Sequence, residues 1–449
     1  MQKCLIKNAT LVNEGKVFKA SVLIEGQHIS RIFTEEAAIP SEVLEKYPVI
    51  QAGGCYLLPG VIDTHVHFRE PGLTHKADML SESRAALAGG VTSFFDMPNT
   101  IPQTTTLDAW EQKMSLAAEH SMANYAFYLG ATNDNLSELI HADYSRIPAV
   151  KLFMGASTGN MLVDESSALK ELFSSIKAII AVHAESENII RQNKERYMAQ
   201  AGIELPIRYH SLIRDAEACY RSSAQAVEWA SKYGSRLHIL HLSTQRELSL
   251  LKDLALEEKK ITAEVCVHHM WFDDRDYERL GAAIKWNPSV KQETDKLALR
   301  TALNCNLIDV VATDHSPHLW SEKEGSCFEA ASGAPSVQFG LVLMLELSGR
   351  GAFGLDTVVE KMCHAPARLF RIVKRGFIRE GYFADLTLLK PGAARKIGKG
   401  EIISKCGWSP YEGENVSWHV EKTFVNGSLL YDQGRFSQEK AARALEFSV

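Results

Sequence analysis

Short apolar runs recur along the middle of the chain, and each is followed by a longer segment whose apolar residues have helical spacing. The runs are "GVTSFFDM", "NYAFYLGA", "AVKLFMGA", "AIIAVHAE", "RLHILHLS", "ITAEVCVHH" and "IDVVATD". Repeated alternation of strand and helix is typical of parallel βα units. Seven or eight such units over residues 58–379 predict a (β/α)₈ barrel of the α/β class. A doubly wound open sheet is the competing layout, but no GxGxxG sequence follows the first strand.

Both ends of the chain have a different sequence pattern. Short β-rich runs are separated by turn signals, and there is little helical periodicity. The N-terminal part contains "KVFKASVLIEGQHISRIF", and the C-terminal part contains "EKTFVNGSLLYDQGRF", with a hairpin signal at Asn426-Gly427. We therefore expect residues 1–57 and 380–449 to pair as one small β-sandwich-like domain built from both chain ends.

Composition narrows the class of protein. The chain has 449 residues, 45% of them hydrophobic and 23% charged, which is ordinary for a soluble globular protein with one large domain and a smaller one. A net charge of −6 argues against a general nucleic-acid binder. There is no apolar stretch of transmembrane length and no apolar core of signal-peptide length near the start. The eight cysteines form no CxxC pair, which indicates free thiols in a reducing compartment, so we predict a cytoplasmic protein.

Residue types that bind metals occupy the ends of the apolar runs. His65 and His67 lie in "GVIDTHVHFREPG", and a spacing of two residues directs both side chains to the same side of a strand. The C-terminal ends of barrel strands converge on one face, and that face carries the active site. The candidate metal ligands are His65, His67, Lys151, His183, His241 and Asp314.

Each of these residues also has a structural interpretation. A lone histidine in an apolar strand is usually a hydrogen-bonded core residue, and we assign that role to His238. Lys151 would ordinarily pair with an acid or extend to solvent, and Asp314 could cap a following helix. Six such residues at successive strand ends favour a metal site instead. Imidazole and carboxylate without thiolate suit zinc or a similar ion, and the number of ligands suits two ions. The residues alone give Lys151 no role, since an ammonium repels a cation.

Eight stretches of the chain, in order, resemble the dihydroorotase family of the cyclic amidohydrolase superfamily. They are "DTHVHFREPG", "DMPNT", "VKLFMGAS", "VHAE", "HLST", "EVCVHH", "KWNPSVK" and "ATDHSPHLWSEK". The resemblance implies two Zn²⁺ ions per chain, bridged by a carboxylated Lys151 and a hydroxide. His65, His67 and Asp314 would bind one ion, and His183 and His241 the other. Some members of the family bridge the ions with an aspartate, but the stretch around Lys151 is similar to that of lysine-bridged members.

The resemblance also implies a reaction, which is the reversible hydrolysis of (S)-dihydroorotate to N-carbamoyl-L-aspartate in pyrimidine (UMP) biosynthesis. Asp314 would be the catalytic acid and base. Arg69, Asn99 and His318 would bind the substrate carboxylate, and Asn287 would contact the substrate ring. The alternative for Arg69 is a surface ion pair with Glu70, and the alternative for Asn99 is a turn.

Three other functions remain open from the sequence. Allantoinase and dihydropyrimidinase or hydantoinase share the superfamily, but their substrates do not require Arg69. A non-catalytic subunit that scaffolds a partner such as aspartate transcarbamoylase is a third possibility, although such a subunit would be expected to lack metal ligands. We further expect a homodimer and a loop over the pocket in the Gly- and Ser-rich stretch 321–340.

Overall fold

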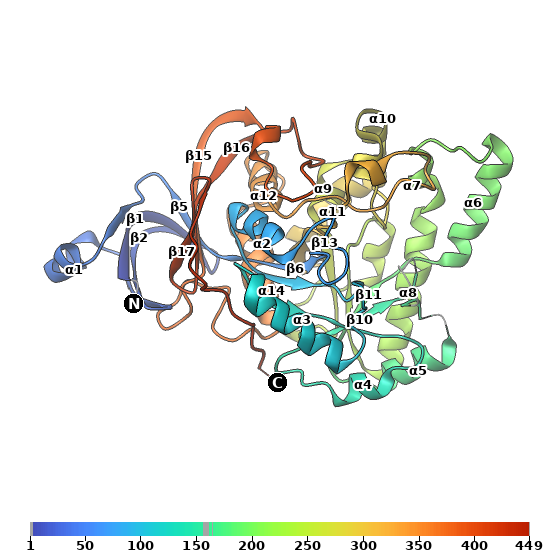
Figure 1. Ribbon diagram of the computed structural model, residues 1–449, viewed down its shortest axis with the longest axis horizontal. Coiled ribbons are helices and arrows are strands. Elements are labelled where there is room, and N and C mark those ends of the chain that lie inside the picture. Colours follow the sequence, from blue (N-terminus) through green and yellow to red (C-terminus); the bar gives the residue numbers. More distant parts are fainter. Residues whose placement is uncertain (1–2, 156–160, 164, 449) are drawn as a thin grey trace.

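The computed structural model describes residues 3–155, 161–163 and 165–448. One end of the elongated molecule is a β-sheet, and the other is a barrel surrounded by helices (Figure 1). Strands from both ends of the chain share the first sheet, which confirms the prediction that the two ends build one β unit.

This sheet has nine strands in one hydrogen-bonded array. Its order is β18-β17-β16-β15-β5-β1-β2-β3, and β4 pairs with β1. The two halves of the chain meet where β5 pairs antiparallel with β15, with Leu57 opposite Leu388. The predicted turn at Asn426 and Gly427 joins β16 to β17, and both residues have the positive φ that such a two-residue hairpin requires. The strands are β1 (Lys3–Asn13), β2 (Lys16–Glu25), β3 (His28–Phe33), β4 (Val49–Gln51), β5 (Tyr56–Pro59), β15 (Leu386–Lys396), β16 (Asn415–Val425), β17 (Ser428–Asp432) and β18 (Arg435–Phe436).

The barrel consists of parallel strands at eight positions, which confirms the predicted fold. Two of its short strands, β8 and β9, are the halves of one position on either side of Tyr128. The array closes where Val66 bridges to His315, beside β14. The strands are β6 (Val61–Val66), β7 (Val91–Asp96), β8 (Asn124–Phe127), β9 (Leu129–Gly130), β10 (Val150–Phe153), β11 (Ile179–His183), β12 (Arg236–Ile239), β13 (Ile261–Cys266) and β14 (Val310–Ala312).

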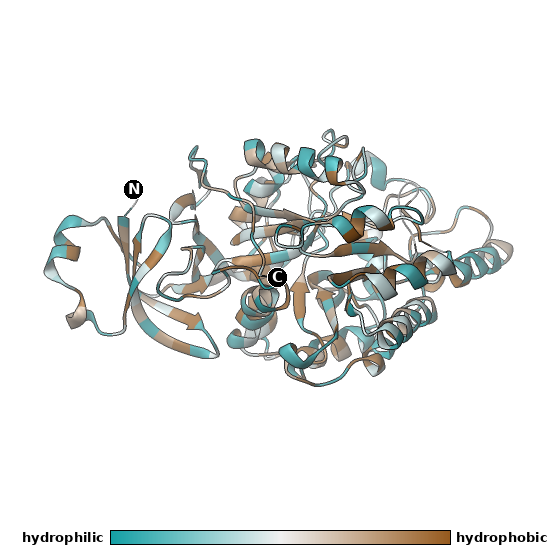
Figure 2. Ribbon diagram, turned by 90° about the horizontal axis from the view of Figure 1, so that it is seen from below, coloured by the Kyte–Doolittle hydropathy of each residue, from teal (hydrophilic) through white to brown (hydrophobic). Residues whose placement is uncertain are grey.

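Helices follow these strands and cover the outside of the barrel. In Figure 2 the apolar colouring is strongest along the strands, whereas the helices carry a mixture of polar and apolar residues. They are α2 (Met79–Ala88), α3 (Leu107–His120), α4 (Leu136–His141), α5 (Ser166–Ser175), α6 (Glu187–Ala201), α7 (Tyr209–Ile213), α8 (Ala216–Tyr233), α9 (Val267–Trp271), α10 (Tyr277–Leu280), α11 (Glu293–Asn304), α12 (Gly340–Gly349), α13 (Leu355–Val359) and α14 (Ala365–Leu369). A further helix, α1 (Ser41–Lys46), lies between β3 and β4 at the sheet end of the molecule.

A buried carboxyl group fastens the first barrel strand to the last. Asp63 in β6 accepts hydrogen bonds from the backbone of His65, at 3.2 Å, and from the backbone and hydroxyl of Thr313, at 3.2 and 2.6 Å. Burial raises the pKa of Asp63 to about 7. The strand ends that carry His65 and Asp314 are thereby fixed side by side, although 250 residues separate Asp63 from Thr313 in the sequence.

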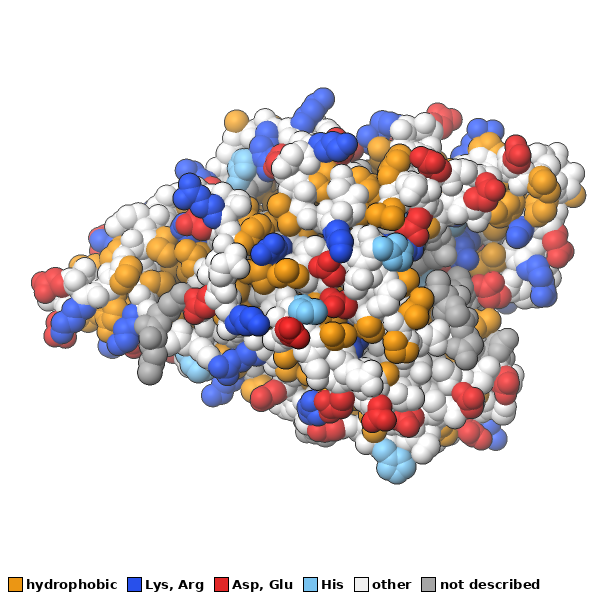
Figure 3. Space-filling view, in the orientation of Figure 1, with side chains coloured by type: hydrophobic (Ala, Val, Ile, Leu, Met, Phe, Trp, Pro, Cys, Tyr) orange, Lys and Arg blue, Asp and Glu red, His pale blue; other side chains and the backbone are white. Residues whose placement is uncertain are grey.

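The molecular surface carries charges of both signs, as the small net charge of −6 suggests. Acidic and basic side chains are interspersed over the face shown in Figure 3. Among the described residues, no helix is both long enough and apolar enough to span a bilayer.

Candidate metal centre and substrate pocket

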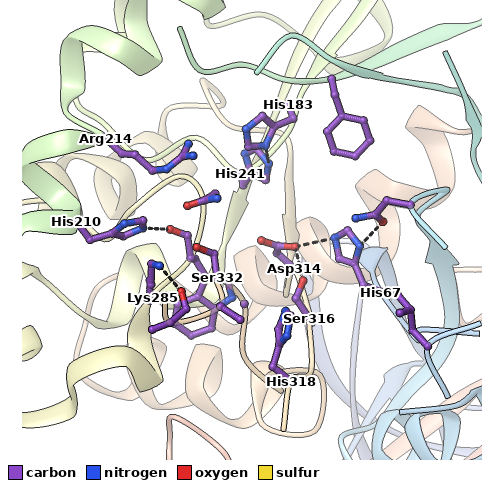
Figure 4. A pocket seen from close by; sticks show the side chains of 18 of the residues that line it. His67, His183, His210, Arg214, His241, Lys285, Asp314, Ser316, His318 and Ser332 are labelled. Carbon is purple, nitrogen blue, oxygen red and sulfur yellow. Dashed lines mark hydrogen bonds and ion pairs between the residues drawn. The ribbon is translucent and has the colours of Figure 1, made fainter. Parts of the chain in front are cut away.

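His65, His67 and Asp314 form a compact group at the C-terminal face of the barrel. The Oδ1 atom of Asp314 lies 3.4 Å from Nε2 of His65 and 3.2 Å from Nε2 of His67. One atom from each of the three residues can be chosen so that all lie within 4.8 Å of one another. Figure 4 shows Asp314 at the centre of the pocket with His67 pointing toward it. The spacing of two residues between the histidines therefore places both on one side, as the sequence predicts.

A second pair of imidazoles lies beside this group. Nδ1 of His183, at the end of β11, faces Nε2 of His241 at 2.9 Å, and the rings of His241 and His65 are 5.2 Å apart. Burial lowers the pKa of both His183 and His241, which keeps them in the neutral form that can bind a cation. Within the described part of the chain, Nδ1 of His241 is buried without a hydrogen-bond partner. These features fit a metal-binding site.

Lys151 lies in β10 and is almost completely buried at 1% exposure. Burial lowers the pKa of its amine to about 7, which leaves a substantial neutral fraction at neutral pH and more above it. Its Nζ lies 4.4 Å from the ring centre of Phe153. A neutral amine removes the electrostatic objection to a lysine in a metal site, because only its protonated form repels cations.

Acidic and amide side chains contact the ring nitrogens of His65 and His67 that point away from Asp314. The Oε1 atom of Glu264 lies 2.8 Å from Nδ1 of His65, and the side-chain oxygen of Asn99 lies 2.7 Å from Nδ1 of His67. Such contacts fix the tautomer and direct the other ring nitrogen at the metal position. Asn99 is therefore placed at the site, but its oxygen is already engaged with His67, so its amide NH₂ is the group that can face a ligand.

Glu185 and Arg214 lie beside the other ring nitrogen of His183, which makes no hydrogen bond among the described residues. The Oε2 atom of Glu185 lies 3.1 Å from Nε2 of His183 and accepts a 2.5 Å hydrogen bond from Arg214. Burial raises the pKa of Glu185, but Arg214 and His183 outweigh that effect and lower it to about 2. Sequence reasoning missed Glu185, Arg214 and Glu264. The signal for Glu264 was a charged residue inside the apolar run "ITAEVC".

We expect Glu264→Gln to weaken metal binding about 10- to 100-fold, because a neutral amide holds His65 less strongly than a carboxylate does. The measurement is metal retained against a competing chelator. Glu247→Gln is the matched control, since Glu247 is equally buried but bonds Ser223 and Thr244 instead. Equal metal retention in the two variants would contradict the orienting role of Glu264.

A basic group borders the cluster of His65, His67 and Asp314 on one side. Arg69 is buried, with Nε donating to the carbonyl of Pro317 at 3.0 Å and Nη2 lying 3.0 Å from Nε2 of His318. Lys76 approaches the other ring nitrogen of His318 at 3.2 Å. Together with Asn99, these residues line the same pocket as His65, His67 and Asp314. This end of the pocket is suited to an anionic group.

The surface ion pair considered for Arg69 and Glu70 does not occur. Glu70 accepts a hydrogen bond from the backbone of Met79 at 2.9 Å and contacts His120 at 2.9 Å. Arg69 instead turns into the pocket with a φ of 67°. The capping role considered for Asp314 is also wrong, since the helical turn that follows it begins only at Trp320.

His210, Arg214 and Lys285 lie across the pocket from His67 (Figure 4). Asn287 also lines this cavity, which has a volume of about 1200 Å³. The Oδ1 atom of Asn287 is buried and has no hydrogen-bond partner among the described residues. Residues 327–333 also line the cavity, which places part of the predicted 321–340 loop over the pocket.

Three residues of the site have unusual backbone conformations. Arg69, His241 and Asp314 have φ values of 67°, 38° and 45°, in the left-handed region that side chains other than glycine disfavour. Such strain persists only where surrounding contacts impose it, and it concentrates at functional sites.

His238 differs from these residues. It hydrogen-bonds Thr262 at 2.9 Å and packs on Phe370, as expected for a structural histidine.

The parallel barrel, with histidine, lysine and aspartate side chains gathered at its C-terminal face, is typical of barrel enzymes. The chain belongs to the amidohydrolase family, whose sequence model matches residues 56–430. It is a hydrolase that acts on cyclic amides, as predicted.

Relatives of known activity lie within this family. The chain is 33% identical to a dihydroorotase of Methanosarcina acetivorans over 440 residues, which is 95% of this chain and 91% of that protein. It is 29% identical to an allantoinase of Bacillus velezensis, over 97% of this chain and 96% of that protein. Among solved structures, the L-hydantoinase (dihydropyrimidinase) of Arthrobacter aurescens superposes with a TM-score of 0.92 at 27% identity, covering 99% of this chain and 100% of that one. The resemblance to dihydroorotases within the cyclic amidohydrolases is confirmed.

Proposed function

We propose that the protein is a dihydroorotase, which reversibly hydrolyses (S)-dihydroorotate to N-carbamoyl-L-aspartate. The observation that carries the proposal is the buried guanidinium of Arg69 beside the candidate metal ligands. Dihydroorotate differs from neutral dihydropyrimidines by its carboxylate, and a guanidinium can bind a carboxylate with two parallel hydrogen bonds. Arg69, His318 and the amide of Asn99 would bind this group, and Asn287 would contact the ring.

The donor set fits two Zn²⁺ ions. His65, His67 and Asp314 would hold one, His183 and His241 would hold the other, and Lys151, carboxylated by CO₂, would bridge them. The lowered pKa of Lys151 supports this, because the neutral amine is the form that reacts with CO₂. When bound, the ions would activate water as a nucleophile and polarise the substrate carbonyl.

The chain's own residues would position the substrate and move the proton. During hydrolysis, water forms a bond to the ring carbonyl carbon, and the bond from that carbon to the ring nitrogen breaks. Asp314 would take the proton from the water and deliver it to the departing nitrogen. The neighbouring imidazoles outweigh the upward effect of burial and hold the pKa of Asp314 well below its ordinary range, so its carboxyl group is ionised before it meets the water proton. Ring closure uses the same residue in the opposite order.

Hydantoinase or allantoinase activity is the second candidate, favoured by the structural likeness to L-hydantoinase. The substrates of those enzymes would leave Arg69, a buried charge, without a carboxylate partner, which is costly. We therefore rank them below dihydroorotate. A homodimer, a cytoplasmic location and an association with aspartate transcarbamoylase remain predictions.

The test is an activity assay of the zinc-loaded protein with dihydroorotate, allantoin and dihydrouracil at equal concentrations. We expect strong turnover of dihydroorotate and weak or no turnover of the neutral rings. Preferred turnover of a neutral ring would overturn the proposal while leaving the family unchanged. No turnover of any substrate, with zinc bound, would favour a non-catalytic scaffold subunit.

A further inference from the structure

The loop between β15 and β16, residues 397–414, extends from the nine-stranded sheet to the side of the pocket that holds Arg69. The backbone N–H of Lys405 donates to the carboxylate of Glu82 in α2 at 3.0 Å. The hydroxyl of Ser409 donates to the carbonyl of Pro335 at 3.2 Å. These bonds tie the loop to two separate parts of the barrel. Trp408 lies between the two bonded positions.

Trp408 is held firmly and makes a specific hydrogen bond. Its side chain is largely buried, and its ring packs against that of Trp320 in a T-shaped arrangement, with a centroid distance of 5.2 Å and an angle of 77°. The indole N–H donates to the backbone carbonyl of His318 at 2.8 Å. An indole has only this one donor, so the contact uses the full hydrogen-bonding capacity of the side chain.

The segment that receives this bond is the one that carries the anion-binding histidine. Inside the pocket, Arg69 donates to the carbonyl of Pro317 and contacts the ring of His318. The neighbouring carbonyl, that of His318, is bonded by Trp408. Two consecutive peptide units are thus fixed by residues on different parts of the chain. The ring of His318 can hold its place between Arg69 and Lys76 only while these units keep their orientation.

We propose that Trp408 is a positioning residue for His318, so that the nine-stranded sheet supplies part of the substrate-recognition site. The inference rests on the proposed function, because the group recognised by His318 is the carboxylate of the substrate. Among the described residues, no hydrogen bond or ring contact joins Trp408 to the candidate metal ligands, Asp314 included. The loss of Trp408 therefore weakens substrate binding and leaves the chemical step largely intact.

The test compares Trp408→Phe with Trp418→Phe in the zinc-loaded protein. The first variant removes the indole N–H and keeps an aromatic ring. The second makes the same change in β16 of the same hairpin, where Trp418 packs on Tyr56. We expect Trp408→Phe to raise KM for dihydroorotate about five- to twentyfold with kcat within about twofold, because one buried hydrogen bond is lost. Trp418→Phe is expected to change neither.

A double variant separates positioning from general destabilisation. In a His318→Ala background, Trp408→Phe is expected to raise KM less than about twofold, because the side chain through which it acts is gone. An undiminished effect in that background, or an unchanged KM in the single variant, would overturn the inference.

A readout without substrate keeps the inference distinct from the proposed function. Amide hydrogen exchange over residues 315–323 should be faster in Trp408→Phe than in Trp418→Phe. If wild-type protein does not turn over dihydroorotate, the proposed function fails, and faster exchange would still establish the positioning of His318. Unchanged exchange would refute the positioning role whatever the substrate is.

Discussion

Lys151→Ala is expected to abolish hydrolysis, with kcat/KM lower by about 10³-fold or more. The amine of Lys151 is the group proposed to become the bridge between the two metal ions. Metal activation contributes several kcal/mol to stabilising the transition state, and each 1.36 kcal/mol corresponds to tenfold in rate. The variant should also hold less than two equivalents of zinc per chain, as measured by metal analysis after gel filtration.

Restoring the activity of Lys151→Ala with small carboxylic acids would show that the missing group is the carboxylate bridging the two ions. The cavity left by the lysine side chain can admit formate or acetate, whose carboxylate resembles the end of a carbamate. We expect either acid to restore part of the activity of Lys151→Ala. Lys361→Ala is the control, because Lys361 is also buried but donates to the carbonyl of Ile308 outside the pocket. Full zinc content and near-normal activity in Lys151→Ala would exclude a carboxylated lysine.

Arg69→Ala is expected to reduce kcat/KM for dihydroorotate by roughly 30- to 5000-fold, since truncating a buried charge pair costs about 2–5 kcal/mol. Turnover of dihydrouracil, which lacks the carboxylate, should change less than about threefold. Arg69→Lys should lie between wild type and Arg69→Ala, because lysine keeps the charge and loses the two-pronged geometry. The measurement is steady-state kinetics with both substrates.

The control for Arg69 is Arg275→Ala, which removes an exposed guanidinium outside the pocket that pairs with the largely buried carboxylate of Asp273. It should leave both substrates unaffected. An equal loss for dihydroorotate and dihydrouracil in Arg69→Ala would mean that Arg69 supports the fold of the pocket and does not recognise the carboxylate. The dihydroorotase assignment would then lose its main support, whereas the amidohydrolase family would not.

The pattern of the sequence is sufficient to predict the barrel and the grouping of its strand-end residues. The alternation of β6, continued one residue past its end at Val66, places His65 and His67 on one side, and the shared direction of the strands brings in His183. His241 and Asp314 follow the same logic, although each lies two residues beyond its strand. Both residues have a left-handed backbone conformation, which strand periodicity does not predict.

Contacts between distant elements could not be predicted in this way. Arg214 reaches Glu185 from the end of α7, and a short helix gives no sequence signal of where it packs. Trp408 is a tryptophan in a loop, and only the path of that loop brings it to His318. The engagement of Asn99 with His67 also depends on the spacing of two strands. Local periodicity determines which way a side chain points along a strand, but it carries no information about what a loop reaches.

The pairing of β5 with β15 affects how the chain folds as it is made. These neighbours in the sheet are separated by roughly 330 residues, so on the ribosome β5 must wait for its partner for about 15 to 65 s at typical synthesis rates. During that interval an apolar strand edge is available to other nascent chains. We therefore expect products truncated before β15 to aggregate and the full chain to depend on chaperones, because two strands that pair in this sheet are made so far apart in time.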